Sequence, residues 1–163
     1  MTEHAADTPG IVAAAAAGIP FAVARTQRAR SAEESAALQG IELHQLLRSI
    51  VVRRGANDYV FVLAPGGRRI DWPKLRAYLG TRRVSLPDAE EARAATGYER
   101  GAITPFGATT AWPVLLDASV DPAGTVAIGG GAHGVNLHVV ATDLIRATGA
   151  TVVDVTEPEP PAT

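Results

Sequence analysis

The most informative segment of this chain is Thr96-Gly-Tyr-Glu-Arg-Gly-Ala-Ile-Thr-Pro-Phe-Gly107. It contains a Gly-x-x-x-Pro loop, from Gly101 to Pro105, and two further segments follow it: Pro113-Val-Leu-Leu-Asp117 and Gly129-Gly-Gly-Ala-His-Gly134. The first of these predicts a strand that ends in an aspartate, and the second predicts another glycine-rich loop. The two glycine-rich loops therefore lie on either side of this strand in the sequence.

Glycines in such loops lack a β-carbon, so a backbone N–H or C=O can come close to a ligand. Pro105 fixes its own φ and favours an extended conformation at Thr104, which stiffens the first loop. An isolated glycine-rich turn is usually an ordinary turn, but these two loops flank a strand and follow the order of a known family, described below, which favours a binding site. The residues of the two loops that we expect to contact a ligand are Gly101, Thr104, Pro105, Phe106, Gly107, Gly129, Gly130 and Gly131.

Helix and strand signals alternate on both sides of these loops. Helices are predicted over 11–17, 31–39, 71–79, 88–96 and, with Thr142 as its cap, 142–148. Strands are predicted over 21–25, 50–53, 59–63, 84–86, 114–116, 125–128, 136–140 and 151–155. The expected fold class is therefore α/β: a single compact domain in which helices surround a mixed, curved sheet.

Length and composition indicate one domain. The chain has 163 residues, 47% of them hydrophobic, which suits a single core. We expect the polar residues 1–9 and the proline-rich, acidic residues 157–163 to lack fixed structure, and a domain over 10–156. The apolar run 11–17 is too short to span a membrane and lacks the basic region of a signal peptide. The chain also has no cysteine, so we expect a cytoplasmic protein without a membrane role.

The charge balance limits the partners and cofactors. The net charge of -2 argues against nonspecific binding to nucleic acid, DNA included, because that binding depends on neutralising phosphates. Four histidines without cysteine partners or an i, i+4 histidine pair predict no metal site. The chain has no P-loop, and neither a helix nor a distal acid follows Gly129 as a dinucleotide fingerprint requires. We therefore expect no cofactor.

The motifs follow the order seen in a known family. Ala17-Gly-Ile-Pro-Phe21, the helix capped at Ser31, the hairpin around 55–58 and Arg69-Ile-Asp71 precede the two loops. In this order the chain resembles the YbaK/prolyl-tRNA-synthetase-associated domain family. The resemblance implies a compact, barrel-like α/β domain that hydrolyses the ester of mischarged aminoacyl-tRNA in trans. Its expected partners are the tRNA acceptor end carrying an aminoacyl group and an aminoacyl-tRNA synthetase.

Two positions depart from the pattern of that family. Arg48 stands where the family has a pocket lysine, and Ser49 takes the place of the threonine that follows it. Arginine keeps the positive charge but cannot act as a neutral amine, because it does not lose its proton. Asn136 replaces an aspartate of the cysteinyl-tRNA-deacylating members, which keeps a carbonyl acceptor and removes the charge. The resemblance thus implies Arg48, Gly101 and Asn136 as catalytic residues and Ser49 as a substrate contact.

Asp117 and two histidines complete the candidate site. The resemblance places Asp117 at the border of the pocket, where its carboxylate could orient Arg48 or hold loop amides; a strand-end turn is the alternative. His133 lies in the second loop, where an imidazole can contact substrate as a general base or simply be exposed. Strand alternation puts Asn136 and His138 on one face, toward either the pocket or solvent.

Two functions remain open from the sequence. The first is a trans-acting aminoacyl-tRNA deacylase whose catalysis comes mainly from backbone donors and substrate orientation. The second is a binding or regulatory module that keeps the cleft but has lost turnover, which the departures at Arg48 and Asn136 favour. An unrelated small-molecule hydrolase is disfavoured, because the chain has no Gly-x-Ser-x-Gly nucleophile motif.

Overall fold

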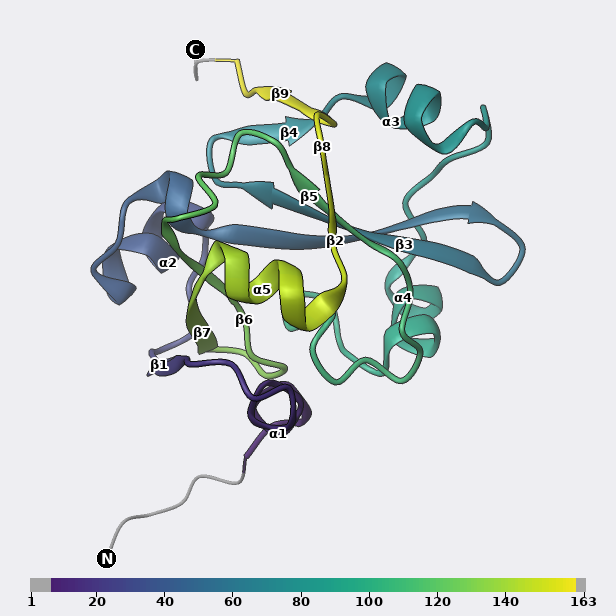
Figure 1. The fold of residues 1–163 in the computed structure, drawn as a ribbon. Helices are drawn as coiled ribbons and strands as arrows, with labels where there is room; N and C mark the ends of the chain where they lie inside the picture. Colours follow the sequence, from purple (N-terminus) through teal and green to yellow (C-terminus); the bar gives the residue numbers. More distant parts are fainter. Residues whose placement is uncertain (1–6, 161–163) are drawn as a thin grey trace, which may run out of the picture.

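The computed structural model describes residues 7–160, and helices and strands alternate along them (Figure 1). The helices are α1 (Pro9–Ala16), α2 (Ala32–Gln39), α3 (Trp72–Leu79), α4 (Ala89–Thr96) and α5 (Ala141–Thr148), with a short 3-10 turn, η1 (Leu43–Gln45). The strands are β1 (Ala22–Arg25), β2 (Leu47–Gly55), β3 (Asp58–Pro65), β4 (Arg68–Ile70), β5 (Val114–Asp117), β6 (Thr125–Gly129), β7 (Val135–Val140), β8 (Thr151–Val153) and β9 (Thr156–Pro158).

Side-chain caps and left-handed glycines set the limits of α2, α3 and α4, as the sequence predicts. Ser31, Asp71 and Asp88 each accept a hydrogen bond from the backbone N–H three residues further along. The glycine that ends each of these helices has a φ of 69°, 69° or 83°. These three helices therefore form where local sequence alone favours them.

The expected cap of α5 is wrong. The helix begins at Ala141, with Val140 at its N-cap position and Thr142 already inside the first turn. Loop carbonyls take the place of a side-chain cap: Ala141 N–H donates to Gly124 O (2.9 Å) and Thr142 N–H to Pro122 O (3.0 Å). β7 runs directly into α5 because these distant carbonyls satisfy the free amides of the first turn.

The strands form three sheets. β2, β3, β5 and β8 form a mixed sheet in that order, antiparallel between β2 and β3 and parallel thereafter. β1, β7 and β6 form an antiparallel sheet, and β4 pairs with β9. A parallel bridge between Leu46 and Ala127 links the two larger sheets. The α/β class and the mixed sheet are confirmed, whereas barrel-like closure is not, because the strands divide among three sheets.

β3 is buried on both faces and separates two hydrophobic cores. Phe61 and Leu63 point into the larger core, which α5 covers with Leu144. The alternating residue Val62 points into a smaller core that α3 covers with Leu75. In Figure 1, α5 accordingly lies in front of the strands, α3 lies near β9 at the top, and α1 lies below β1. The larger core is the one that supports the two glycine-rich loops.

β2 is an edge strand whose free side is open along its middle. Within residues 7–160, the side of β2 opposite β3 is bridged at its start, to β6, and at Arg53, to Ser85. The N–H and C=O of Arg53 both bond to Ser85 (2.8 and 3.0 Å), so Arg53 directs its backbone away from β3. Ser49 and Val51 lie four and two residues before Arg53. Because backbone groups alternate sides along a strand, both residues also direct their N–H and C=O to this free side.

The predicted strand over 84–86 is wrong. Its middle residue, Ser85, forms an isolated bridge to Arg53, and no ladder extends from it. The next residue that would face β2 is Pro87, which has no N–H to donate. The segment therefore closes one end of the open edge of β2 without extending the sheet.

The described chain continues beyond the limits expected for the domain. Thr8 is buried and caps α1, which starts at Pro9. At the other end, β9 reaches Pro158, and the Glu159 N–H donates to Gly67 O (2.9 Å). Residues 1–6 and 161–163, where unstructured ends are also expected, lie outside the described residues. None of the helices within 7–160 is both long and apolar enough to cross a membrane.

We predict that Gly10→Ala destabilises the protein although it places a better helix former inside α1. A β-carbon at Gly10 would lie 2.5 Å from the carbonyl oxygen of Gly130, and backbone atoms cannot yield as a flexible side chain can. The cost should be about 1–3 kcal/mol, as for an overpacked core, measured as the free energy of unfolding in urea. Val12→Ala, on the exposed face of the same helix, is the matched control and should change stability little. Equal stability of both variants would contradict this account of α1.

Candidate active-site cleft

A cleft of about 660 Å³ lies between the two glycine-rich loops, α2, the start of α4 and the open edge of β2. Such a volume is typical of sites that take a small organic group. The residues that line it belong to the segments 26–35, 46–51, 86–92, 100–103 and 129–136. Six of the predicted site residues are among them: Arg48, Ser49, Gly101, Gly129, His133 and Asn136.

The two loops touch one another where they line the cleft. Gly101 has a φ of 90°, and a β-carbon there would lie 3.1 Å from Cε1 and 3.4 Å from Nδ1 of His133. The other ring nitrogen, Nε2, lies 3.6 Å from the carboxylate of Glu99. The imidazole is therefore held between the loops, with Nε2 toward Glu99 and Nδ1 toward Gly101.

The remaining loop residues brace the cleft from behind and do not line it. Thr104 and Phe106 are buried, and the Tyr98 hydroxyl donates to the Phe106 carbonyl (2.6 Å). Gly130 N–H donates to Val135 O (2.8 Å), and Thr8 donates its hydroxyl to the Gly130 carbonyl. The structure thus separates the expected ligand contacts into two groups, and the group that lies outside the cleft lining is Thr104, Pro105, Phe106, Gly107, Gly130 and Gly131.

Glycine is required in this rear group for packing. A β-carbon on Gly131 would lie 3.1 Å from the Tyr98 ring and 3.2 Å from Gly10 N, and one on Gly107 would meet the carbonyl of Pro9. Both glycines have positive φ as well, at 94° and 74°. Their role is to let α1 close against the backs of the loops.

Ser49 supplies a polar group to the wall of the cleft. Its hydroxyl oxygen is buried and, among residues 7–160, has no hydrogen-bond partner. Strand alternation puts its side chain on the same face as Leu47 and Val51, which belong to the larger core. A buried hydroxyl without a partner costs free energy unless a ligand or water completes it. Together with its free backbone groups, this makes Ser49 a candidate for substrate contact.

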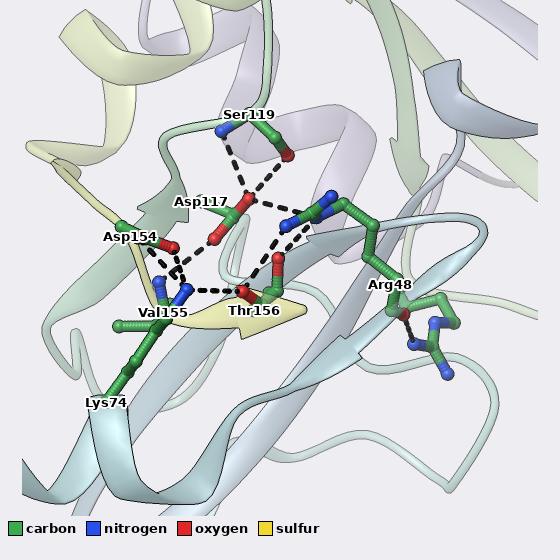
Figure 2. A network of polar contacts seen from close by, with 8 residues as sticks. Arg48, Lys74, Asp117, Ser119, Asp154, Val155 and Thr156 are labelled. Atoms are coloured by element: carbon green, nitrogen blue, oxygen red, sulfur yellow. Dashed lines mark hydrogen bonds and ion pairs between the residues drawn. The ribbon is translucent and has the colours of Figure 1, made fainter. Parts of the chain in front are cut away.

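The side chain of Arg48 lies on the face of β2 opposite that of Ser49, and its guanidinium is already hydrogen-bonded within the protein. Its Nη2 donates to the carbonyl of Arg68 (Figure 2). The same nitrogen lies 4.0 Å from the carboxylate of Glu159. The expected orientation of Arg48 by Asp117 is therefore wrong. The arginine beside Asp117 is Arg68, whose Nε lies 3.7 Å from the carboxylate.

Asp117 lies outside the cleft and anchors the end of the chain. Its side chain is 1% exposed, and it accepts hydrogen bonds from the N–H of Val155 (3.0 Å) and from the N–H (3.1 Å) and hydroxyl of Ser119 (Figure 2). Burial alone raises the pKa of this carboxyl, but the hydrogen bonds from Ser119, Val155 and Thr156 outweigh it and hold the pKa below its ordinary value. Asp117 thus holds backbone amides, and because one of them belongs to Ser119, two residues further along, it also forms the strand-end turn that was the alternative.

Asn136 and His138 do share a face of β7, as strand alternation predicts. His138 Nε2 lies 2.8 Å from Gln39 Oε1 on α2, and His138 does not line the cleft. Asn136 does line it, together with Ser35 of α2. Asn136 therefore faces the space between β7 and α2.

Three arginines that the sequence analysis did not single out also line the cleft. Arg28 and Arg30 come from the connection between β1 and α2, and Arg100 comes from the loop after α4. The available signal was the density of arginine just before the capping box, at positions 25, 28 and 30. As for metals, the residues within 7–160 bring no three His, Asp or Glu side chains together as ligands.

Comparison with known proteins assigns the chain to a family: residues 26–147 match the aminoacyl-tRNA editing domain, and the chain belongs to this family. The matched residues include every segment that lines the cleft, from the connection before α2 to β7. The editing reaction of the family acts on aminoacyl-tRNA, so the class of protein agrees with the resemblance that the motifs imply.

Individual relatives are distant. The Enterococcus faecalis protein named "Putative Cys-tRNA(Pro)/Cys-tRNA(Cys) deacylase EbsC" is 24% identical over 129 residues, which cover 79% of each chain. A proline–tRNA ligase of Thermosipho melanesiensis is 28% identical over 121 residues, or 74% of this chain and 21% of the ligase. A crystal structure described as "a putative trans-editing enzyme for prolyl tRNA synthetase" is 27% identical, with a TM-score of 0.81 over 91% of this chain and 95% of that one.

We predict that Asp117→Asn destabilises the protein by about 1.5–3 kcal/mol near neutral pH, because it removes hydrogen bonds to a charged group. Since the pKa of Asp117 is lower in the folded state than its ordinary value of 3.8, its stabilisation is present above that pH and is lost as pH falls below it. The difference in unfolding free energy between wild type and variant should therefore shrink from about pH 6 to about pH 3. A difference that stays constant over this range would contradict the role of the charge.

Proposed function

We propose that this chain is a trans-acting deacylase that cleaves the ester of mischarged aminoacyl-tRNA. The observation that carries the proposal is the convergence of Gly101, Gly129, Ser49 and His133 on one cleft, in a chain of the aminoacyl-tRNA editing family. The cleft has the volume for an aminoacyl group attached to a terminal ribose. An aminoacyl-tRNA synthetase is the expected source of the mischarged substrate.

Backbone groups stabilise charge in this mechanism. Ser49 and Val51 direct their N–H groups to the free side of β2, and Gly101 and Gly129 line the same cleft. Hydrogen-bond donors fixed before the reaction can stabilise the oxyanion that forms when the ester carbonyl is attacked. Binding the acceptor end in this orientation supplies a further part of the rate acceleration.

His133 is the proposed general base. Nε2 faces the carboxylate of Glu99, and the ring edge formed by Cε1 and Nδ1 faces Gly101, so the proposal uses Nδ1 as the proton acceptor. Nδ1 takes a proton from water as the water oxygen bonds to the ester carbon. The bond from that carbon to the ribose oxygen then breaks, and Nδ1 returns the proton to the ribose oxygen. The products are a free amino acid and a tRNA with an intact terminal ribose.

A binding module without turnover is the second candidate, and one observation favours it. The guanidinium of Arg48 is held by the Arg68 carbonyl on the face of β2 opposite Ser49, so it is not free to contact the ester. A cleft of this kind could bind aminoacyl-tRNA without cleaving it. Release of amino acid from a panel of mischarged tRNAs therefore distinguishes the two candidates.

We predict that His133→Ala lowers the single-turnover rate of deacylation by a factor of about 10² or more, the usual contribution of a general base. The measurement is release of labelled amino acid from the tRNA that wild type cleaves fastest. His138→Ala is the matched control: it is also half-buried, but its imidazole contacts Gln39 outside the cleft, so it should keep the wild-type rate.

Two results would count against this account. Equal rates for the two histidine variants would remove His133 from the mechanism while leaving a deacylase. Wild type that binds aminoacyl-tRNA but releases no amino acid from any member of the panel would establish the binding module instead.

A further inference from the structure

Three arginines that line the cleft form no ion pair among the described residues. Arg28 and Arg30 come from the connection before α2 and Arg100 comes from the loop after α4, and all three residues are exposed. Among residues 7–160, no ion pair involves any of them. By contrast, the arginines that do pair with a carboxylate are Arg48, Arg53, Arg54, Arg68, Arg69 and Arg146.

Hydrogen bonds hold the backbone at Arg30 and near Arg100, although neither guanidinium forms an ion pair within residues 7–160. Arg30 N–H donates to the carboxylate of Glu34 (2.8 Å), which ties the connection to the first turn of α2. The turn that carries Arg100 closes with a hydrogen bond from Ala102 N–H to Glu99 O (2.9 Å). Their positions at the cleft are therefore set, and only the side chains must order when a ligand binds.

The charge of the cleft is opposite to that of the whole protein. The chain has a net charge of -2, yet Arg28, Arg30 and Arg100 line the cleft with a single aspartate, Asp88; Arg48 also belongs to the lining, but its guanidinium is held by the Arg68 carbonyl. Asp88 is itself occupied as the cap of α4, where its carboxylate accepts the Glu91 N–H (2.8 Å). Basic side chains gathered at one cleft of an acidic protein attract an anion to that cleft specifically.

We propose that Arg28, Arg30 and Arg100 bind successive phosphodiester groups of the unpaired nucleotides at the 3′ end of the acceptor strand. A guanidinium matches a phosphate with two parallel hydrogen bonds, and it keeps its charge at any pH of interest. Cationic groups from two separate segments of the lining suit a strand that runs along the cleft, with its last ribose directed inward to Ser49 and Gly101. This inference rests on the proposed function and assigns the polynucleotide part of the substrate to the rim of the cleft.

Binding of uncharged RNA tests the inference separately from catalysis. The probe is a short RNA hairpin that ends in unpaired CCA, compared with the same hairpin without the tail and with free AMP. The test variant is R28Q/R30Q/R100Q. The control variant is R76Q/R82Q/R83Q, which changes the net charge equally at arginines outside the cleft lining and without an ion pair among the described residues.

We expect wild type to prefer the tailed hairpin and R28Q/R30Q/R100Q to lose that preference, with at least a tenfold weaker Kd. Each lost phosphate contact on a single strand lowers the slope of log affinity against log salt by about 0.7, so the slope should fall by about 2 in total. The control variant should keep the wild-type preference and slope for the tailed hairpin.

Three results would overturn the inference: equal loss in both variants, unchanged binding by R28Q/R30Q/R100Q, or binding of AMP as tight as that of the tailed hairpin. The proposed function is tested by a different measurement, the cleavage of aminoacyl-tRNA. If the arginine variant loses RNA binding as expected but wild type cleaves no aminoacyl-tRNA, the rim assignment stands and the deacylase proposal fails.

Discussion

Close approach of backbone to backbone behind the cleft is the constraint on which the rest of this structure depends. Gly10 of α1 packs on the carbonyl of Gly130, and Gly107 packs on the carbonyl of Pro9, at separations that leave no room for a β-carbon. These contacts, with the Tyr98 hydroxyl on the Phe106 carbonyl, fix both glycine-rich loops from the rear. The fronts of the loops, Gly101 and Gly129, remain free to face the cleft.

The charged groups also form two sets: one supports the fold, and the other is suited to bind a ligand at the cleft. Asp117, the buried anion among them, is neutralised by backbone amides and by Arg68, and the carbonyl of Arg68 in turn holds Arg48 (Figure 2). This network connects β2, β4, β5 and β9 at one end of the molecule. The arginines at the cleft that form no ion pair in the described part of the chain are therefore the ones suited to an anionic ligand. The uncharged lining at Ser49 is suited to the aminoacyl group attached to that ligand.

Local sequence predicted the fold wherever the determinants were local. The capped helices α2, α3 and α4 and the β2–β3 hairpin form as expected, because their caps, glycines and turn residues act within a few positions. The start of α5 was not predictable, since its first amides bond to the distant carbonyls of Pro122 and Gly124. For the same reason, a bridge at Ser85 could not be told from a strand before its position opposite Arg53 was known.

The site was predictable in part, for a related reason. Glycine is required where a ligand comes close to the backbone, and it is also required where another backbone segment does. The sequence alone does not distinguish these two cases. Gly101 and Gly129 face the cleft, whereas Gly107 and Gly131 face α1 and Tyr98. The partner of Asp117 was likewise a matter of three-dimensional packing, because Arg48 and Arg68 are equally plausible from their charge alone.

The most direct measurement is an NMR titration with an adenosine that carries an aminoacyl group through a non-hydrolysable 3′-amide. If the cleft between the fronts of the loops binds the aminoacyl end, the backbone amide signals of Ser49, Gly101 and Gly129 shift most, and those of Gly107 and Gly131 stay nearly constant. Saturable shifts that centre on Gly107 and Gly131, with Ser49 and Gly101 unaffected, would contradict the account and place the ligand elsewhere.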